Sequence, residues 1–158
     1  MKDIVFVFES FEVFNGKELK FKYYYKNQAG EILANFTEII KCPLEIDRTD
    51  ETVQYILQQL HIVIGTSYYK SQLGDIELPY KLNENESEYW NTVYDSGFGE
   101  LSFVNKIEHP IKPFKQQTET ARKPTSMDTD GAMLGIGGGK DSIVAGELLK
   151  RINVETTT

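Results

Sequence analysis

Three consecutive glycines, Gly137, Gly138 and Gly139, stand directly before Lys140, Asp141 and Ser142. Glycines have no side chains to keep an anion away from their backbone N–H groups, and they can take the positive φ values that turn successive N–H groups inward. A following helix would add its own free N–H groups and the positive end of its dipole. The lysine would add a mobile positive charge suited to phosphate. These residues therefore predict a cradle for pyrophosphate.

Two common phosphate loops do not fit this spacing. A Walker A loop needs a glycine five positions before its last glycine and a Ser or Thr after the lysine, where this chain has Leu134 and Asp141. The fingerprint G-x-G-x-x-G fails because its last glycine would fall on Lys140 or Ser142. The arrangement resembles instead the S-G-G-x-D-S loop of the PP-loop ATP pyrophosphatases, with Gly137 in place of the usual serine. A glycine-rich turn without a ligand is the alternative interpretation.

Composition limits the class of protein. With 40% hydrophobic residues, nine Tyr and nine Phe, the chain of 158 residues can build a packed core. The net charge of −7 argues against non-specific binding to nucleic acid or to an anionic membrane. No stretch has the length and apolarity of a membrane span, and the start lacks a signal-peptide cleavage site. We expect a cytoplasmic protein in which the single cysteine, Cys42, is a small apolar residue.

Alternating aromatic and aliphatic residues predict an antiparallel meander in the first third of the chain. Period-two patterns indicate strands over residues 6–13, 19–25 and 32–41. Asn15 and Gly16 between the first two strands predict a type I′ hairpin turn, because both tolerate positive φ. The aromatic residues are interpreted as core packing.

Helical patterns follow the meander. Asp47 to Asp50 offer N-caps for a helix whose apolar spacing continues to Gly65, and His61 within it is interpreted as a core histidine. A polar and aromatic cluster comes next: Ser67, Tyr68, Tyr69 and Lys70. A second helix is expected over residues 83–94 and, after a glycine-rich break, a strand containing Leu101, Phe103 and Val104.

The C-terminal part is typical of the opening of a different domain. We expect a strand near residues 132–136, the glycine loop, a helix over 141–151 and the start of a second strand. The predicted fold class is α+β: an N-terminal α+β domain over 1–109, a linker or surface excursion over 110–130, and the start of an α/β PP-loop (HUP-like) domain over 131–158. Because a buried parallel strand needs neighbours, we expect the chain to be the front part of a longer protein.

Several separate segments, in the right order, resemble one enzyme family. They resemble the ATP-dependent UDP-N-acetylmuramoyl-L-alanyl-L-glutamate epimerase family (the MurL type), with the Ser-Tyr-Tyr-Lys and Gly-Gly-Gly-Lys-Asp-Ser segments as the specific parts. The matching segments are residues 36–38, 61–70, 97–100 with Asn105 beyond, and 134–142.

The resemblance implies an activity, cofactors and a partner. It implies inversion of the terminal L-glutamate of a nucleotide-linked muramoyl dipeptide for peptidoglycan synthesis, with ATP and Mg²⁺ as cofactors and AMP and pyrophosphate as products. Adenylating the glutamate carboxylate would remove its charge, so that a modest base could take the α-proton. A general acid and base on the two faces of the carbon would complete the inversion.

The same resemblance suggests roles for the candidate site residues. Gly137, Gly138 and Gly139 would hold the pyrophosphate through backbone N–H groups, Lys140 would neutralise it, and Ser142 would donate to a phosphate oxygen. Asp141 would either cap the helix or hold Mg²⁺.

A second candidate cluster is assigned to the substrate. Its residues are Ser67, Tyr68, Tyr69 and Lys70, with Glu100 and Asn105 facing the same cleft. A lysine beside two tyrosines would hold an anionic group such as the UDP diphosphate or a glutamate carboxylate. In the alternative interpretation the tyrosines pack a helix end and Lys70 is solvated.

Two other functions stay open at this point. The first is another PP-loop adenylating enzyme, an amide ligase or a tRNA-modifying enzyme, although the acidic charge and the lack of a cysteine pair oppose tRNA modification. The second is a non-catalytic domain that binds a ligand.

Overall fold

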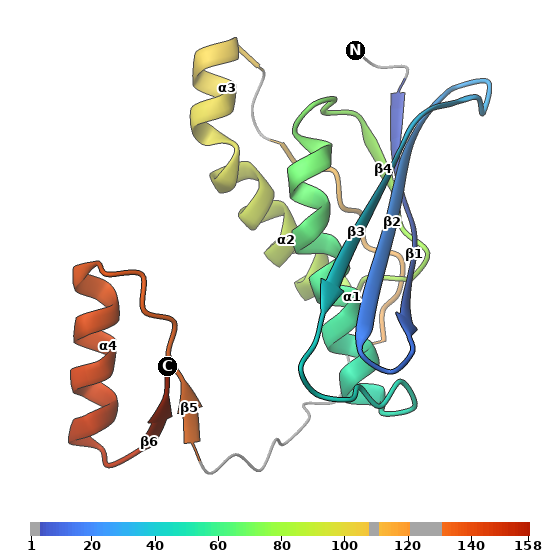
Figure 1. Ribbon diagram of the computed structural model, residues 1–158. Coiled ribbons are helices and arrows are strands. Elements are labelled where there is room, and N and C mark those ends of the chain that lie inside the picture. Colours follow the sequence, from blue (N-terminus) through green and yellow to red (C-terminus); the bar gives the residue numbers. More distant parts are fainter. Residues whose placement is uncertain (1–3, 108–110, 121–130) are drawn as a thin grey trace. The chain divides into compact units, whose positions relative to one another are not determined.

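The computed structural model describes residues 4–107, 111–120 and 131–158 (Figure 1). They belong to two compact units, Met1–Arg122 and Lys123–Thr158. Within the described residues, no helix is long and apolar enough to cross a membrane.

The first unit is built on a four-stranded mixed sheet with the order β3-β2-β1-β4. The strands are β1 (Ile4–Phe14), β2 (Glu18–Asn27), β3 (Ile32–Lys41) and β4 (Asp75–Glu77). β1, β2 and β3 pair antiparallel, which confirms the predicted meander. Asn15 and Gly16 have φ values of 50° and 69°, as a type I′ turn requires. The short β4, which pairs parallel to β1, has no counterpart among the predicted elements.

Three helices follow, and local capping sets where the first two begin. α1 (Glu51–Tyr69) starts where the Asp50 side chain accepts from the N–H groups of Thr52 and Val53. α2 (Glu84–Gly97) starts at a capping box formed by Asn83 and Glu86. α1 extends about one turn beyond the apolar pattern, so Ser67, Tyr68 and Tyr69 are helical.

The strand expected around Leu101 is wrong, because residues Gly99–Asn105 form α3. Its apolar residues do not alternate between a buried and an exposed face. Phe103 is 86% exposed and its neighbour Val104 is 67% exposed, whereas Ser102 is buried. A short apolar run does not separate helix from strand by periodicity alone.

Aromatic rings fill the space between the sheet and α1 and α2. The fully or nearly fully buried members include Phe6, Phe8, Phe21, Tyr23, Tyr69, Tyr94 and Trp90. Tyrosine hydroxyls connect the sheet and α2 to α1: Tyr23 Oη donates to the His61 carbonyl (3.0 Å), and Tyr94 Oη donates to the Ile62 carbonyl (2.8 Å). Burying aromatic rings while pairing their hydroxyls avoids the cost of an unpaired buried polar group.

His61 is a core residue, as its position predicted. It is fully buried, and its ring lies within 6 Å (centroid to centroid) of Phe8, Phe11, Phe21 and Tyr23. Burial lowers the pKa of the imidazole to about 4, because desolvation disfavours the charged form.

The segment from residue 111 to 120 packs on the first unit. Ile111 and Phe114 are buried, and the Phe114 backbone exchanges two hydrogen bonds with the Asn91 side chain (3.0 and 2.9 Å). These two residues are anchored to the first unit, while most residues from 111 to 120 are exposed, and the linker or surface excursion over 110–130 stays a prediction. Residues 121–130 of that range lie outside the described residues.

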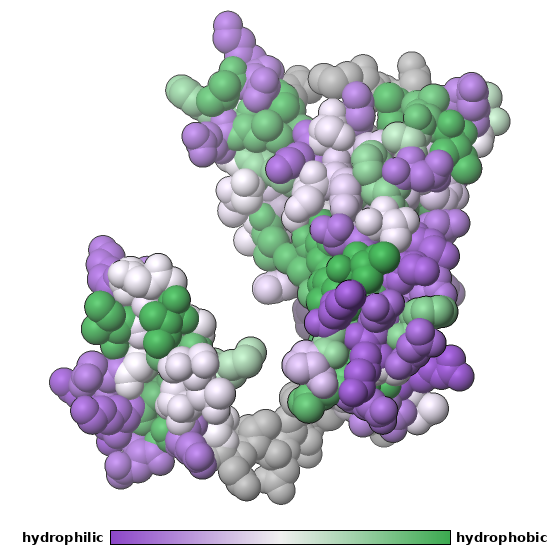
Figure 2. Space-filling view, in the orientation of Figure 1, coloured by the Kyte–Doolittle hydropathy of each residue, from purple (hydrophilic) through white to green (hydrophobic). Residues whose placement is uncertain are grey.

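The second unit is a strand, loop, helix and strand: β5 (Gly131–Met133), α4 (Lys140–Arg151) and β6 (Glu155–Thr157). β5 and β6 pair parallel, in the element order that the sequence predicted. Apolar residues lie on the visible surface of this unit (Figure 2). The apolar residues of this unit that are more than half exposed include Met133, Ile136, Ile143, Val144 and Leu148.

Candidate functional site

The glycine loop leaves its backbone open to a ligand. Gly138 has φ +76°, which strongly favours glycine. A Cβ added at Gly137, Gly138 or Gly139 would meet nothing within 4 Å. α4 begins immediately afterwards, at Lys140, so the loop joins a helix N-terminus whose first N–H groups point away from the helix.

The residues after the glycines begin α4. Gly139 is the N-cap residue and has no side chain to accept a hydrogen bond, while Asp141 places an acidic group in the first turn, which the helix dipole favours. The Ser142 hydroxyl donates to the Gly139 carbonyl (2.8 Å). Ser142 would have to exchange this bond to donate to a phosphate.

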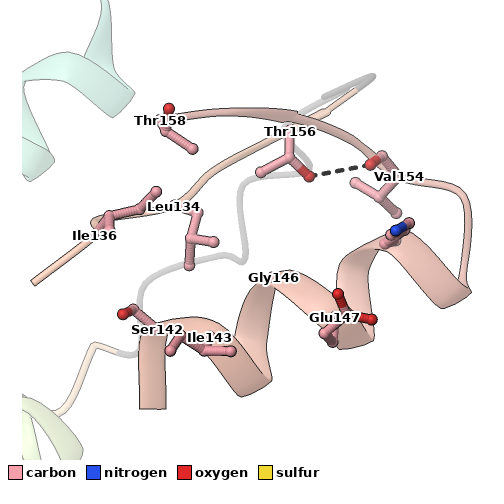
Figure 3. Close-up of a pocket in the computed structure, with 10 residues that line it drawn as sticks. Leu134, Ile136, Ser142, Ile143, Gly146, Glu147, Val154, Thr156 and Thr158 are labelled. Carbon is pink, nitrogen blue, oxygen red and sulfur yellow. Dashed lines mark hydrogen bonds between the residues drawn. The ribbon is translucent and has the colours of Figure 1, made fainter. Parts of the chain in front are cut away.

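A hollow of about 490 Å³ lies between the strands and α4 (Figure 3). Leu134 and Ile136 line it from the strand side, and Ile143 and Gly146 from α4. Ser142 borders it, whereas Gly137, Gly138, Gly139, Lys140 and Asp141 are not among its lining residues. Its mainly apolar walls are typical of sheet-to-helix packing rather than of a phosphate site.

No group of three or more His, Cys, Asp or Glu side chains in the described part of the chain is placed to hold a metal ion. Mg²⁺ commonly binds through one or two carboxylates, substrate phosphates and water. Asp141 is the carboxylate nearest in sequence to the glycine loop, and this arrangement would suit an ion that arrives with a nucleotide.

The second predicted cluster divides into two groups. Ser67 and Lys70 at the end of α1 and Glu100 and Asn105 from α3 all line one pocket of about 490 Å³. Asn105 Nδ2 donates to the Leu101 carbonyl (2.8 Å). Among the residues that the structure describes around this pocket, Lys70 is the one cation and Glu100 the one anion. The pocket can therefore pair an anionic group with Lys70 and accept a proton donor on Glu100.

The two tyrosines point elsewhere. Tyr69 is buried among core rings, and its hydroxyl donates to the Gly74 carbonyl (2.9 Å). Tyr68 stacks on Phe36 (centroids 4.6 Å apart) and donates to Glu38 Oε2 (3.1 Å). Successive helix residues point about 100° apart, so these tyrosines face away from the pocket that Ser67 and Lys70 line. Their contacts hold the end of α1 in place. Burial raises the pKa of the Tyr69 hydroxyl well above its usual range.

Sequence reasoning missed a groove between α1 and α2. Ile56 and Val63 are 46% and 43% exposed and line this groove of about 640 Å³ together with Gln59 and Trp90. The helical spacing of the apolar residues alone indicates a core face and no more. The width of the apolar stripe on α1 was the signal that could have revealed the groove. A helix needs apolar residues over only part of its circumference to pack on a sheet, so apolar residues beyond that part indicate a second apolar surface.

Comparison with known proteins decides the family. A family model described as the MurL N-terminal domain matches residues 2–158. The chain belongs to the MurL N-terminal domain family.

Three relatives of this family member carry the name UDP-N-acetyl-alpha-D-muramoyl-L-alanyl-L-glutamate epimerase. The protein from Salinispora tropica is 34% identical over 151 residues, 90% of this chain and 32% of the relative. Relatives from a Micromonospora species and from Xanthomonas oryzae pv. oryzae are 33% and 32% identical over 76% and 66% of this chain, and over 29% and 24% of their own lengths. The chain thus spans about a third of the length of these relatives, or less. No solved structure matches it significantly.

Proposed function

We propose that this chain supplies the N-terminal part of an ATP-dependent enzyme of peptidoglycan biosynthesis. The enzyme would convert the terminal L-glutamate of UDP-N-acetylmuramoyl-L-alanyl-L-glutamate to D-glutamate through a carboxyl-adenylate. The observation that carries the proposal is the family match over residues 2–158, together with relatives that share one epimerase name. The open glycine loop before α4 supports it.

Charge explains why ATP is needed. A free carboxylate opposes loss of the neighbouring α-proton, because a second negative charge would develop beside the first. ATP would supply an AMP group that removes the carboxylate charge while pyrophosphate leaves, and water would cleave the adenylate after inversion to release AMP and the free acid. Proton removal and return on opposite faces of the carbon then require a positioned base and acid. His61 is not this base, since it is fully buried among aromatic rings.

The loop residues would bind the polyphosphate. The N–H groups of Gly138, Gly139 and the first turn of α4 would donate to the phosphate oxygens. There is room for a phosphate, because a Cβ added at either glycine would meet no atom within 4 Å. Lys140 would neutralise charge that develops on the leaving pyrophosphate. Asp141 would hold Mg²⁺ directly or through water.

The pocket between α1 and α3 would bind an anionic group of the muramoyl substrate. Lys70 supplies the charge, and Ser67 and Asn105 supply polar side chains in the same lining. Tyr68 and Tyr69 would act indirectly, by fixing the helix end that carries Lys70.

Pyrophosphate release tests this function in the natural gene product that contains the chain. We expect release from ATP and Mg²⁺ only when UDP-N-acetylmuramoyl-L-alanyl-L-glutamate is present, with D-glutamate recovered after acid hydrolysis. Lys140→Ala should lower the rate at least about tenfold, as expected when a charge that stabilises the leaving group is lost. Lys150→Ala, at the opposite end of α4, should not. Release without the muramoyl nucleotide, or with tRNA in its place, would contradict the proposal.

A further inference from the structure

The groove between α1 and α2 and the pocket between α1 and α3 lie in succession along α1. The α1 residues that line them recur at helical spacing: Tyr55, Ile56, Gln59, Leu60, Val63, Thr66, Ser67 and, directly after the helix, Lys70. At about 100° per residue these positions fall on one side of the helix. The side that packs on the sheet contains instead Leu57, His61, Gly65 and Tyr69.

The two halves of this surface differ in chemistry. The α1/α2 groove is lined mainly by aromatic and aliphatic side chains, and no Lys or Arg is among its described lining residues. Its one described anion, Glu86, accepts from the backbone N–H of Asn83 in the capping box of α2. Lys70 lies in the other half, about 16 Å along the helix from Gln59 at about 1.5 Å per residue. Such a surface suits an elongated ligand with an uncharged, ring-containing end and an anionic end.

Gln59 provides a specific polar group in the apolar half. Trp90 Nε1 donates to Gln59 Oε1 (2.8 Å), and because an indole N–H can only donate, this bond fixes which end of the amide is oxygen. The Nε2 group is buried and has no hydrogen-bond partner among the described residues. An unpaired buried donor costs free energy. A rotation of the Gln59 amide toward the groove that Gln59 lines would expose Nε2 and let a carbonyl oxygen on a bound ligand satisfy it.

An exposed aromatic ring lines the same groove. Tyr89 is 60% exposed while Trp90 is 4% exposed, and their rings meet edge to face with centroids 5.1 Å apart. The exposed Tyr89 ring offers a stacking surface for a flat ligand group. A volume of about 640 Å³ is in the usual range for a small-molecule pocket.

We propose that the α1/α2 groove binds the uracil ring of the nucleotide-linked substrate, with Tyr89 stacking on the ring and Gln59 Nε2 donating to a uracil carbonyl. Uracil is flat and uncharged and carries two carbonyl acceptors, which matches the residues in the groove. The anionic part of the same molecule would then extend along α1 toward Lys70. This inference rests on the proposed function, because the muramoyl substrate is what links uracil to an anionic peptide.

Uridine binding to the chain of 158 residues tests the site. Trp90 is the only tryptophan and lines the groove, so its fluorescence reports binding. We expect saturable binding of uridine, weakened about tenfold in Tyr89→Ala, as loss of base stacking predicts, and also weakened in Gln59→Leu. Phe103→Ala removes another exposed ring, one that lines neither pocket, and should leave binding unchanged.

Two outcomes would overturn the inference: uridine does not bind, or Tyr89→Ala and Phe103→Ala behave alike. The proposed function fails separately, if the muramoyl nucleotide elicits no pyrophosphate release while uridine still binds at Tyr89. Conversely, substrate-dependent pyrophosphate release with an unchanged KM in Tyr89→Ala would keep the function and reject the uracil site.

Discussion

Gly65 in the middle of α1 tests how tightly the helix packs on the sheet. A Cβ at this position would lie 2.8 Å from Phe8 Cζ and 3.2 Å from Tyr23 Cε1. Phe8 cannot easily move, since it is fully buried and contacts the rings of Phe6, Tyr23 and His61.

Gly65→Ala should therefore destabilise the first unit despite its better helix propensity. Overpacking a core costs about 1–3 kcal/mol, and replacing a helical glycine by alanine returns at most about 1 kcal/mol. Because the added Cβ would lie under 3.0 Å from a buried ring, the overpacking cost falls in the upper part of its range, about 2–3 kcal/mol. Subtracting about 1 kcal/mol of helix propensity leaves an expected net loss of about 1–2 kcal/mol in the free energy of unfolding. Urea denaturation followed by Trp90 fluorescence measures it.

Gly97→Ala is the matched control, because Gly97 is also helical and an added Cβ there meets nothing within 4 Å. This variant should be as stable as the original chain or slightly more stable. If Gly65→Ala proves as stable as Gly97→Ala, the close packing of α1 on Phe8 is refuted.

His61, Asn83 and Gly138 each give a further prediction. Because burial lowers the folded-state pKa of His61 to about 4, the unfolded chain binds its proton first. The free energy of unfolding is therefore retained above pH about 6.5 and falls as the pH is lowered from there toward 4, by at most about 3 kcal/mol. His61→Gln should flatten this part of the pH–stability profile. An unchanged slope would argue against a buried imidazole. Asn83→Ala removes the capping box of α2 and should cost about 1 kcal/mol in urea denaturation, whereas full stability would show that Glu86 caps the helix alone. Gly138→Ala strains a residue at φ +76° and should weaken ATP·Mg²⁺ binding by the natural gene product in calorimetry. Gly135→Ala is the control, because an added Cβ there also meets nothing within 4 Å. Equal affinities of the two variants would contradict a role for the Gly138 backbone.

Features that depend on neighbouring residues could be predicted from the sequence. Asn15 and Gly16 determine their turn because the required φ values belong to the residues themselves. Asp50 likewise begins α1 through hydrogen bonds to residues two and three positions away. The strand, glycine loop and helix around residue 139 followed from the same kind of local information.

The tertiary structure alone decided how distant segments meet. Ser67 and Lys70 share a pocket with Glu100 and Asn105, whereas their neighbours Tyr68 and Tyr69 turn to the sheet and the core. Likewise, Ile111 and Phe114 are buried, and the Phe114 backbone is held by the side chain of Asn91, 23 positions away. The local sequence pattern determines the backbone conformation of each segment. The packing of a helix face against its partner depends instead on contacts between residues tens of positions apart. Those contacts exist only after the chain has folded.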